Sequence, residues 1–393
     1  MTPAIATECK ADRLKQLPPY VFVELDRAKR RLISEGKDVI DLGVGDPDLP
    51  TPSHIRERLK TAVDDPSNHR YSFSEGIKPL REAIARWYGR RFHVALDPEM
   101  EILPLLGSKE GIAHLPLAVA NPGDVVLVPD PCYPPYRSGA RFAGAEVVSM
   151  PLEEDLQFFP DLGGVSQKAA QRAKLMFLNY PNNPTAAVAT EEQFAQAVQL
   201  ASDYGILVAH DAAYSEIAFD GCQPMSFLQV PDAKTVGVEF HSLSKTYNMT
   251  GWRIGWVCGN AGVIAALTQL KTNLDSGIFQ AIQWAGIEAL EGDQEPMRHA
   301  VTTYQARRDA LVAGLKSCGW DVPAPKASFY VWARLPNTES SSMAFATRVL
   351  ERAHLVITPG VGFGSAGEGY VRFSLTMPIE RIQEAVRRIQ QIL

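Results

Sequence analysis

The feature that most constrains the fold is a regular alternation in the middle of the chain. Short runs of β-branched and apolar residues alternate there with longer segments of helical periodicity. This pattern indicates a mostly parallel β-sheet covered by helices, because parallel neighbours are joined by long crossover connections. We expect strands at residues 125–130, 146–150, 174–180, 206–211, 235–240 and 253–259. We expect helices between several of them, including one near residue 80, one from Glu191 and one from Val263.

The C-terminal part of the chain has a different pattern. A long helical segment at 303–319 leads to short strands around 329–335 and 370–376, and an amphipathic helix follows at 379–393. Strands and helices segregated in this way suggest a smaller α+β domain, and 393 residues exceed the length of one typical core. We therefore predict an N-terminal arm with part of the small domain at 1–46, a large α/β domain at 47–286 and a small domain at 287–393.

Composition and charge exclude several classes of partner. The net charge is −6 and no arm or face is dense in lysine and arginine, so we expect no nucleic-acid partner. No apolar run is long enough to cross a bilayer, and the N-terminus mixes charges of both signs, so we expect no membrane partner and no signal peptide. The five cysteines are scattered and form no C-x-x-C pair, which favours a cytoplasmic protein without a metal site.

Polar residues follow four of the expected strands. They lie in the segments DPCY (130–133), NYPNNP (179–184), HDAAY (210–214) and HSLSK (241–245). In open α/β sheets, ligands bind at the carboxyl ends of the strands, so these residues should converge at one edge of the sheet.

These residue types fit the ring of pyridoxal 5′-phosphate. Lys245 is suited to form a Schiff base with the aldehyde. Asp211 would keep the ring nitrogen protonated and so make the ring an electron sink. Asn183 and Tyr214 could hydrogen-bond the ring hydroxyl, and Tyr133 could stack on the ring face.

A second group of residues fits the phosphate of the same cofactor. Ser242, Ser244 and Arg253 would bind its oxygens, and Gly107, Ser108 and Lys109 offer backbone N–H groups at a helix start. Each element alone has an ordinary structural explanation: a solvated loop, a turn or a helix cap. Their order favours the cofactor, because they fall at successive strand ends.

The segments GSKEG (107–111), NYPNNPT (179–185), HDAAY (210–214) and SLSKTYNMTGWRIG (242–255) resemble the sequential motifs of the class I and II aminotransferases. These are fold-type I enzymes that use pyridoxal phosphate, and the resemblance covers nearly the whole chain. It implies a large domain with a mostly parallel, mixed seven-stranded sheet sandwiched by helices, and a smaller α+β domain. It also implies cofactor-binding roles for Ser108, Lys109, Tyr133, Asn183, Asp211, Tyr214, Ser242, Ser244, Lys245 and Arg253.

The resemblance extends to assembly and to the substrate. Tyr71 is similar to a tyrosine that reaches the phosphate of the neighbouring subunit, which implies an obligate homodimer. Arg372 resembles the family's arginine for the substrate α-carboxylate, although an arginine taken alone is more often part of a surface salt bridge. Gly45 matches a glycine whose backbone approaches the substrate, and Tyr20 lies in the arm that often covers the site.

Transamination needs a group that moves a proton between the substrate α-carbon and the cofactor. The freed amine of Lys245 is placed to act as general base and then as general acid. Neighbouring cations should lower the pKa of this lysine, so that it is neutral at working pH. Two glycine-rich segments, at 43–45 and 360–364, lack the following glycine of a dinucleotide fingerprint, which argues against a dehydrogenase.

The substrate is less constrained. Segments 24–52, 133–152 and 271–283 resemble the LL-diaminopimelate aminotransferase branch, which exchanges the amino group of LL-2,6-diaminopimelate with 2-oxoglutarate in lysine biosynthesis. Lys109 could supply a cation at the far end of the pocket. In that branch an acidic residue stands where this chain has Ser74, so either Glu75 replaces it or the substrate differs.

Three other functions stay open. A broader aspartate, alanine or aromatic aminotransferase would keep every cofactor residue and change only the pocket wall. A carbon–sulfur β-lyase on the same fold would release ammonia and pyruvate without a 2-oxo acid. A cofactor-binding regulator is disfavoured, because the chain has no basic N-terminal helix-turn-helix.

Overall fold

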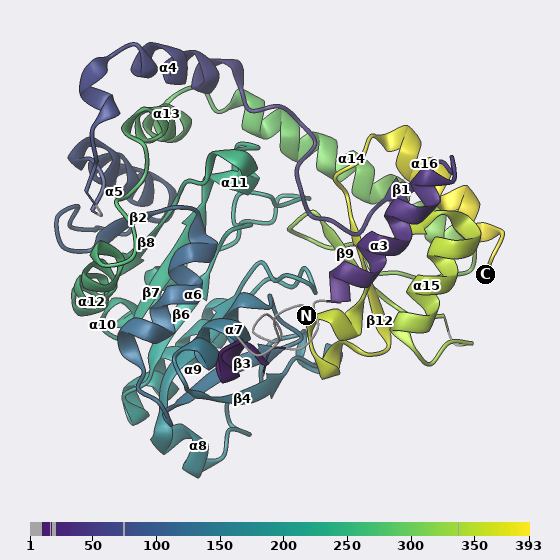
Figure 1. The fold of residues 1–393 in the computed structure, drawn as a ribbon. Coiled ribbons are helices and arrows are strands. Elements are labelled where there is room, and N and C mark those ends of the chain that lie inside the picture. The colour runs from purple at the N-terminus through teal and green to yellow at the C-terminus, as the bar shows by residue number, and fades with distance from the viewer. Residues whose placement is uncertain (1–9, 16, 18–20, 74, 337) are drawn as a thin grey trace, which may run out of the picture.

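The computed structural model describes residues 10–15, 17, 21–73, 75–336 and 338–393 (Figure 1). Its centre is a seven-stranded sheet in the order β2-β8-β7-β6-β5-β3-β4. The strands are β2 (Ile102–Leu105), β3 (Val125–Asp130), β4 (Glu146–Pro151), β5 (Ala173–Asn179), β6 (Leu207–Asp211), β7 (Gly237–Ser242) and β8 (Gly255–Gly259). β8 is antiparallel to both of its neighbours, and the pairs from β7 to β4 are parallel. The predicted α/β class with a mostly parallel, mixed sheet is confirmed.

Three strand predictions need correction. β2 was not expected, because ILPL is short and contains a proline, which is usually confined to edge strands; β2 is indeed at the edge. β7 begins at Gly237, two residues later than predicted, because the preceding residues form α10 (Ala233–Val236). β8 begins at Gly255, because the residues before it form a 3-10 turn that ends with Arg253 in a left-handed conformation (φ 54°).

Helices cover both faces of this sheet (Figure 1). On one face, apolar residues of the sheet pack against α6 (Ser108–Val119), α7 (Pro135–Phe142) and α12 (Ala261–Thr272). On the other face they pack against α5 (Lys78–Phe92), α9 (Glu191–Tyr204) and α13 (Gln280–Glu291). The other helices of this part are α4 (Ser53–Val63), α8 (Gln167–Arg172) and α11 (Leu243–Thr246).

The alternation of side chains along the strands decides which residues reach which face. In β5, Leu175 and Phe177 contact the α6 side, while Met176 and Leu178 contact the α9 side. This period of two follows from the pleat of the strand. Polar residues at successive positions of a strand end therefore point to opposite faces of the sheet.

A second core lies in the C-terminal part of the molecule. Its three-stranded antiparallel sheet has the order β11-β12-β9. The elements are α14 (Glu295–Ser317), β9 (Tyr330–Arg334), α15 (Ser342–Ala353), β10 (Leu355–Val356), β11 (Thr358–Pro359), β12 (Tyr370–Ser374) and α16 (Ile379–Gln390). The strands and helices predicted here are present.

The N-terminal segment joins this second core. It contains α2 (Asp12–Lys15), α3 (Val21–Ser34) and β1 (Ile40–Asp41), and β1 pairs in parallel with β10. The division into an arm, a large domain and a small domain at 46 and 286 stays a prediction.

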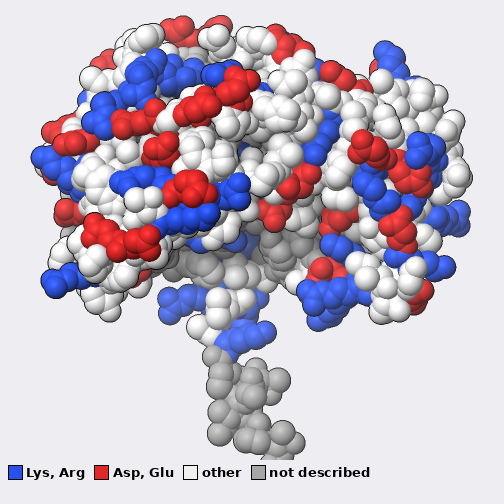
Figure 2. Space-filling view, turned by 90° about the horizontal axis from the view of Figure 1, so that it is seen from above, with Lys and Arg blue, Asp and Glu red and all other residues white. Residues whose placement is uncertain are grey.

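The surface carries charges of both signs. Figure 2 shows acidic and basic side chains interspersed over the face seen there. Within the described part of the chain, every helix is too short or too polar to span a membrane.

Candidate active site

A cavity of about 1020 Å³ lies between the carboxyl ends of the central strands and the small C-terminal sheet. Most of the residues singled out in the sequence line it. They are Gly45, Ser108, Lys109, Tyr133, Asn183, Asp211, Tyr214, Ser242, Ser244, Lys245, Arg253 and Arg372. The predicted convergence at one sheet edge is therefore present, and the role of each residue stays a prediction.

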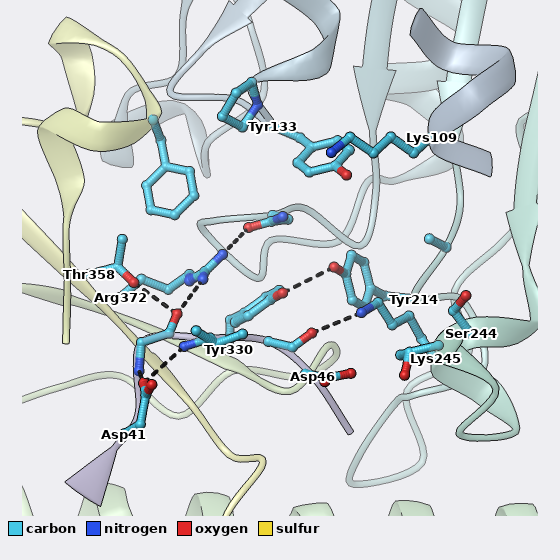
Figure 3. Close-up of a pocket in the computed structure, with 18 of the residues that line it drawn as sticks. Asp41, Asp46, Lys109, Tyr133, Tyr214, Ser244, Lys245, Tyr330, Thr358 and Arg372 are labelled. Atoms are coloured by element: carbon cyan, nitrogen blue, oxygen red, sulfur yellow. Dashed lines mark hydrogen bonds between the residues drawn. The ribbon is translucent and has the colours of Figure 1, made fainter. Parts of the chain in front are cut away.

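Lys245 lies on α11, directly after β7. Its Nζ donates a hydrogen bond to the Gly45 carbonyl at 2.8 Å (Figure 3). Burial is the main cause that lowers the pKa of the Lys245 amine, and the charges of Arg372 and Arg253 lower it further. The lowered pKa agrees with the prediction from the sequence, but burial lowers it more than the neighbouring cations do. A buried lysine of lowered pKa is suited to proton transfer.

Asp211 ends β6 and is buried. The Tyr136 hydroxyl donates to Asp211 Oδ2 at 2.8 Å, and the Ala213 N–H donates to Oδ1 at 3.2 Å. Burial raises the pKa of Asp211, and these hydrogen bonds oppose the shift. A carboxylate in such a site is stabilised in its charged form by a cationic partner in the cavity.

Tyr136 was missed in the sequence. Its ring stacks on Phe177 with 4.9 Å between centroids, so it reads as part of the apolar face of α7. The available signal was its position three residues after Tyr133, which is one helical turn. Asn179, which lies in the predicted strand-end segment 179–184 but was given no role there, lines the cavity; its Nδ2 donates to the Asp211 carbonyl at 2.7 Å and so fixes the end of β6.

Ser242, Ser244, Arg253 and the start of α6 form an anion cradle. The Ser242 side chain caps α11 by accepting from the Ser244 N–H at 3.2 Å. The Ser244 hydroxyl is buried and has no hydrogen-bond partner among the described residues. A buried hydroxyl without a partner is costly, so a ligand oxygen at this place would be favourable.

Gly107 completes this cradle. It precedes α6 with φ 79°, and a Cβ there would lie 2.2 Å from Arg253 Nη2. Only glycine allows the guanidinium to approach the helix N-terminus so closely. Positive charge and helix N–H groups at one point form a site for a phosphate.

Arg372 on β12 is buried and not part of a surface salt bridge. Its Nη1 donates to Asn183 Oδ1 and its Nη2 donates to the Gly43 carbonyl, each at 2.7 Å. Its guanidinium lies 4.0 Å from the ring centroid of Tyr330 and 4.6 Å from that of Phe363. No carboxylate of the described residues pairs with this buried cation, so a substrate carboxylate would satisfy it.

Tyr330 on β9 is a second site residue that the sequence did not reveal. Its hydroxyl lies 3.2 Å from the Tyr214 hydroxyl (Figure 3). A Cβ at Gly45 would lie 1.9 Å from the Tyr330 hydroxyl, so the backbone at 45 can approach only as glycine. The sequence analysis placed Tyr330 in the predicted strand around 329–335. The apolar pattern of that strand does not distinguish Tyr330 from residues of the core.

The segment from Asp41 to Gly45 holds Lys245 and Arg372 through its carbonyl groups. Asp41 Oδ1 accepts from the N–H groups of Gly43 at 2.8 Å and of Val44 at 3.3 Å. We call this segment, residues 41–45, the glycine strap. Its Gly45 and Gly43 carbonyl groups accept from Lys245 and Arg372, two residues that line the cavity.

His210 and His241, which adjoin predicted site residues, do not line the cavity. They point to the other face of the sheet and contact the buried carboxylate of Glu239 at 2.8 and 3.1 Å. The alternation along β6 and β7 explains this separation from Asp211 and Ser242.

Of the other residues named in the sequence analysis, Tyr71 and Glu75 do not line the cavity, and two lie outside the described residues. Tyr71 is 76% exposed and does not line the cavity of its own chain. Glu75 is exposed, and Lys109 lines the cavity near Tyr133 (Figure 3). Tyr20 and Ser74 lie outside the described residues.

Comparisons with known proteins agree on one family. The family model for aminotransferase class I and II matches residues 37–389. The LL-diaminopimelate aminotransferase of Syntrophobacter fumaroxidans is 54% identical over 98% of both chains, and that of Moorella thermoacetica is 52% identical with the same coverage.

Solved structures give the same result. Substrate-bound BacF from Bacillus subtilis has a TM-score of 0.94 and 41% identity over 98% of both chains. A mutant aspartate aminotransferase of Thermus thermophilus has a TM-score of 0.91 and 30% identity over 98% of this chain and 99% of that one. With this fold, this cavity and these relatives, the chain belongs to the class I and II aminotransferases.

Proposed function

We propose that this protein transfers the amino group of LL-2,6-diaminopimelate to 2-oxoglutarate. The observation that carries the proposal is the similarity to relatives named LL-diaminopimelate aminotransferase, which are 49 to 54% identical over at least 96% of the chain. The match extends over nearly the full length, so the segments that form the pocket wall lie within the matched range.

Class I and II aminotransferases use pyridoxal phosphate, which supplies an electron sink for the negative charge at the substrate α-carbon. The described residues fit this group, because the cradle offers an unpartnered buried hydroxyl at Ser244 beside Arg253. We assign the phosphate to Ser108, Lys109, Ser242, Ser244 and Arg253, and the ring and aldehyde to Tyr133, Asn183, Asp211, Tyr214 and Lys245.

Asn183 has a divided role in this assignment. Its Oδ1 accepts from Arg372 Nη1, so the N–H₂ end of the Asn183 amide would be the end that donates to the ring hydroxyl. This one side chain would then contact both the arginine assigned to the substrate carboxylate and the cofactor ring.

The proton transfer is the task of Lys245. Burial keeps the Lys245 amine neutral more easily than in water, so it can take the proton from the substrate α-carbon. Arg372 would hold the α-carboxylate in a bidentate contact and so orient that carbon toward Lys245. The same two residues serve both half-reactions of a ping-pong cycle.

We also propose a homodimer in which Tyr71 of one protomer reaches the phosphate bound by its partner. Tyr71 and Phe73 are 76% and 79% exposed, an unusual degree for aromatic neighbours on a monomer surface. Light scattering of the holoenzyme should give the mass of two chains. A monomer with full activity would refute this part of the proposal.

A cytoplasmic location is the last part of the proposal. Cys132, Cys222, Cys258 and Cys318 are free thiols in the structure, as expected in a reducing compartment. Fractionation of the native host with an antibody against the protein tests it.

The decisive experiment is a half-reaction screen. Holoenzyme is mixed with LL-diaminopimelate, aspartate, alanine, glutamate or phenylalanine, and the visible absorbance of the bound cofactor is followed in single turnover. We expect rapid change with LL-diaminopimelate and glutamate. Rapid change with aspartate or phenylalanine and none with LL-diaminopimelate would refute the substrate. In a separate assay with a β-thioether amino acid such as cystathionine and no 2-oxo acid, release of ammonia, pyruvate and the thiol would indicate a β-lyase.

A further inference from the structure

Helix α3 forms one wall of the cavity. Four of its residues share one helical face at spacings i, i+3, i+4 and i+7, and all four line the cavity: Val23, Asp26, Arg27 and Arg30. We call these four residues the α3 stripe. A different face of the helix, with Ala28 and Leu32, packs against Val356 and so fixes α3 to the small domain.

A chain of three contacts ties α3 to the carboxylate-binding arginine. Lys29 Nζ lies 2.6 Å from Asp41 Oδ2, and the other oxygen of Asp41 accepts from the Gly43 N–H at 2.8 Å. The Gly43 carbonyl in turn accepts from Arg372 Nη2 at 2.7 Å. The α3 stripe therefore has a defined position relative to Arg372.

The α3 stripe carries positive and negative side chains that are exposed enough to bind a ligand. Asp26 and Arg30 form an ion pair of 2.7 Å with side chains 44% and 78% exposed. Ion pairs this exposed stabilise little, so their members can exchange partners at small cost. Arg27 is exposed toward the cavity, and no carboxylate of the described residues pairs with it.

The other cations of the cavity have different positions. Arg253 lies in the anion cradle, Arg372 is held by Asn183, and Lys245 is bound to the glycine strap. Lys109 is at the start of α6, next to the cradle, and Lys29 of α3 pairs with Asp41 of the glycine strap. Among the described residues, the α3 stripe is thus the part of the wall whose cations lie neither at the cradle nor on the glycine strap.

The two substrates of the proposed function, on which this inference rests, differ at their far ends. LL-diaminopimelate carries a carboxylate and an ammonium group on its distal carbon. 2-Oxoglutarate and its product glutamate carry a distal carboxylate alone. A cavity wall that binds both substrates needs a cation for the distal carboxylate in each half-reaction. It needs an anion for the distal ammonium group only in the half-reaction of LL-diaminopimelate.

We propose that the α3 stripe reads the distal end of the substrate. Arg27 binds the distal carboxylate of both substrates, and Asp26 binds the distal ammonium group of LL-diaminopimelate. Asp26 thereby determines specificity for the diamino acid, whereas Arg27 selects dicarboxylates over alanine.

The test uses single-turnover half-reactions of the holoenzyme, followed by cofactor absorbance, for Asp26→Asn and Arg27→Gln. Arg31→Gln is the matched control: Arg31 is on the same helix, is 59% exposed, pairs only with Glu35 among the described residues, and does not line the cavity. The substrates are LL-diaminopimelate, L-2-aminopimelate, which keeps the distal carboxylate without the amine, glutamate and alanine.

For Asp26→Asn we expect kcat/KM to fall about tenfold with LL-diaminopimelate and to stay unchanged with L-2-aminopimelate and glutamate. For Arg27→Gln we expect a fall of about tenfold with all three dicarboxylates and none with alanine. Arg31→Gln should match the wild type throughout.

The outcomes separate this inference from the proposed function. If the wild type turns over LL-diaminopimelate and the variants keep its rate, the inference is wrong and the function stands. If the wild type does not react with LL-diaminopimelate, the function and the role of Asp26 are wrong together, and the role of Arg27 is still decided by glutamate. Equal losses with alanine would show a structural effect and overturn the inference.

Discussion

The guanidinium of Arg372 lies over the ring of Tyr330, 4.0 Å from its centroid. The hydroxyl of the same tyrosine is 3.2 Å from that of Tyr214. Tyr330 thus connects the residue assigned to the substrate carboxylate with one assigned to the cofactor. We expect it to be a positioning residue for both.

Replacing Tyr330 separates these two connections. Tyr330→Leu removes the ring under Arg372, and we expect KM to rise about tenfold for the amino and the 2-oxo acid together, since a buried cation–π contact contributes about 1 to 2 kcal/mol. Tyr330→Phe keeps the ring and should leave KM within about twofold while shifting the absorbance of the bound cofactor through Tyr214. Steady-state kinetics and a spectrum check this; an unchanged KM in Tyr330→Leu would remove the ring from substrate binding.

Lys245→Ala should abolish transamination and the visible absorbance that survives dialysis, because Lys245 is the buried amine of lowered pKa to which we assign the cofactor aldehyde. The loss in kcat should exceed about 10⁴-fold, since both the attachment and the acid–base group are removed. Lys109→Ala is the control and should keep the absorbance band. Retention of the band in Lys245→Ala would refute the assignment.

Gly45→Ala tests the close approach of the glycine strap. A Cβ 1.9 Å from the Tyr330 hydroxyl cannot be accommodated without a shift. We expect the free energy of unfolding to fall by about 1 to 3 kcal/mol and activity to fall with it. Gly89→Ala, in α5 with no atom within 4 Å of the added Cβ, is the control and should be neutral or stabilising. A thermal unfolding curve for each variant measures the difference.

Glu239 predicts a pH-dependent contribution to stability. It is fully buried, accepts from Tyr88 and Ser226 and contacts His210 and His241. Burial raises the pKa of Glu239, but the hydrogen bonds and charges of the two histidines hold it well below its usual 4.5. Because the folded pKa is depressed, the stabilisation is complete above pH 4.5 and decreases as pH falls below that value.

Glu239→Gln should therefore cost about 3 to 5 kcal/mol at pH 7, where a buried charged network is broken. The difference from the wild type should shrink as pH falls from 4.5 toward 3. Urea unfolding at several pH values measures it. A difference that is the same at pH 7 and pH 3 would contradict the predicted ionisation.

The sequence predicted the central strands well because β3, β5 and β6 are buried on both faces and read as continuous apolar runs. The rule that ligands bind at carboxyl ends then predicted the convergence of seven cavity residues, whereas Gly45 and Arg372 were found only through the family resemblance. β2 was not predicted, because its four residues include a proline and are too few to show the pattern of a strand.

The missed residues share one physical reason. Tyr136 and Tyr330 occupy positions in α7 and β9 where the sequence pattern predicts apolar core residues. Hydrophobic periodicity therefore could not predict that their hydroxyl groups face the site. The α3 stripe was missed for a related reason: its charges look like a solvated helix face until the fold places them on the cavity wall. Burial of Lys245, the main cause that lowers its pKa, is likewise a property of the assembled fold.

The pairing of β1 with β10 has a consequence for the order in which the chain is made. The glycine strap follows β1, and its Gly43 carbonyl accepts from Thr358, 315 residues later, and from Arg372, 329 residues later. During translation the glycine strap cannot form its hydrogen bonds to Thr358 and Arg372 until almost the whole polypeptide has left the ribosome. A nascent chain stalled before Thr358 already contains all seven strands of the central sheet, but the site that we assign to the substrate carboxylate forms only as synthesis ends.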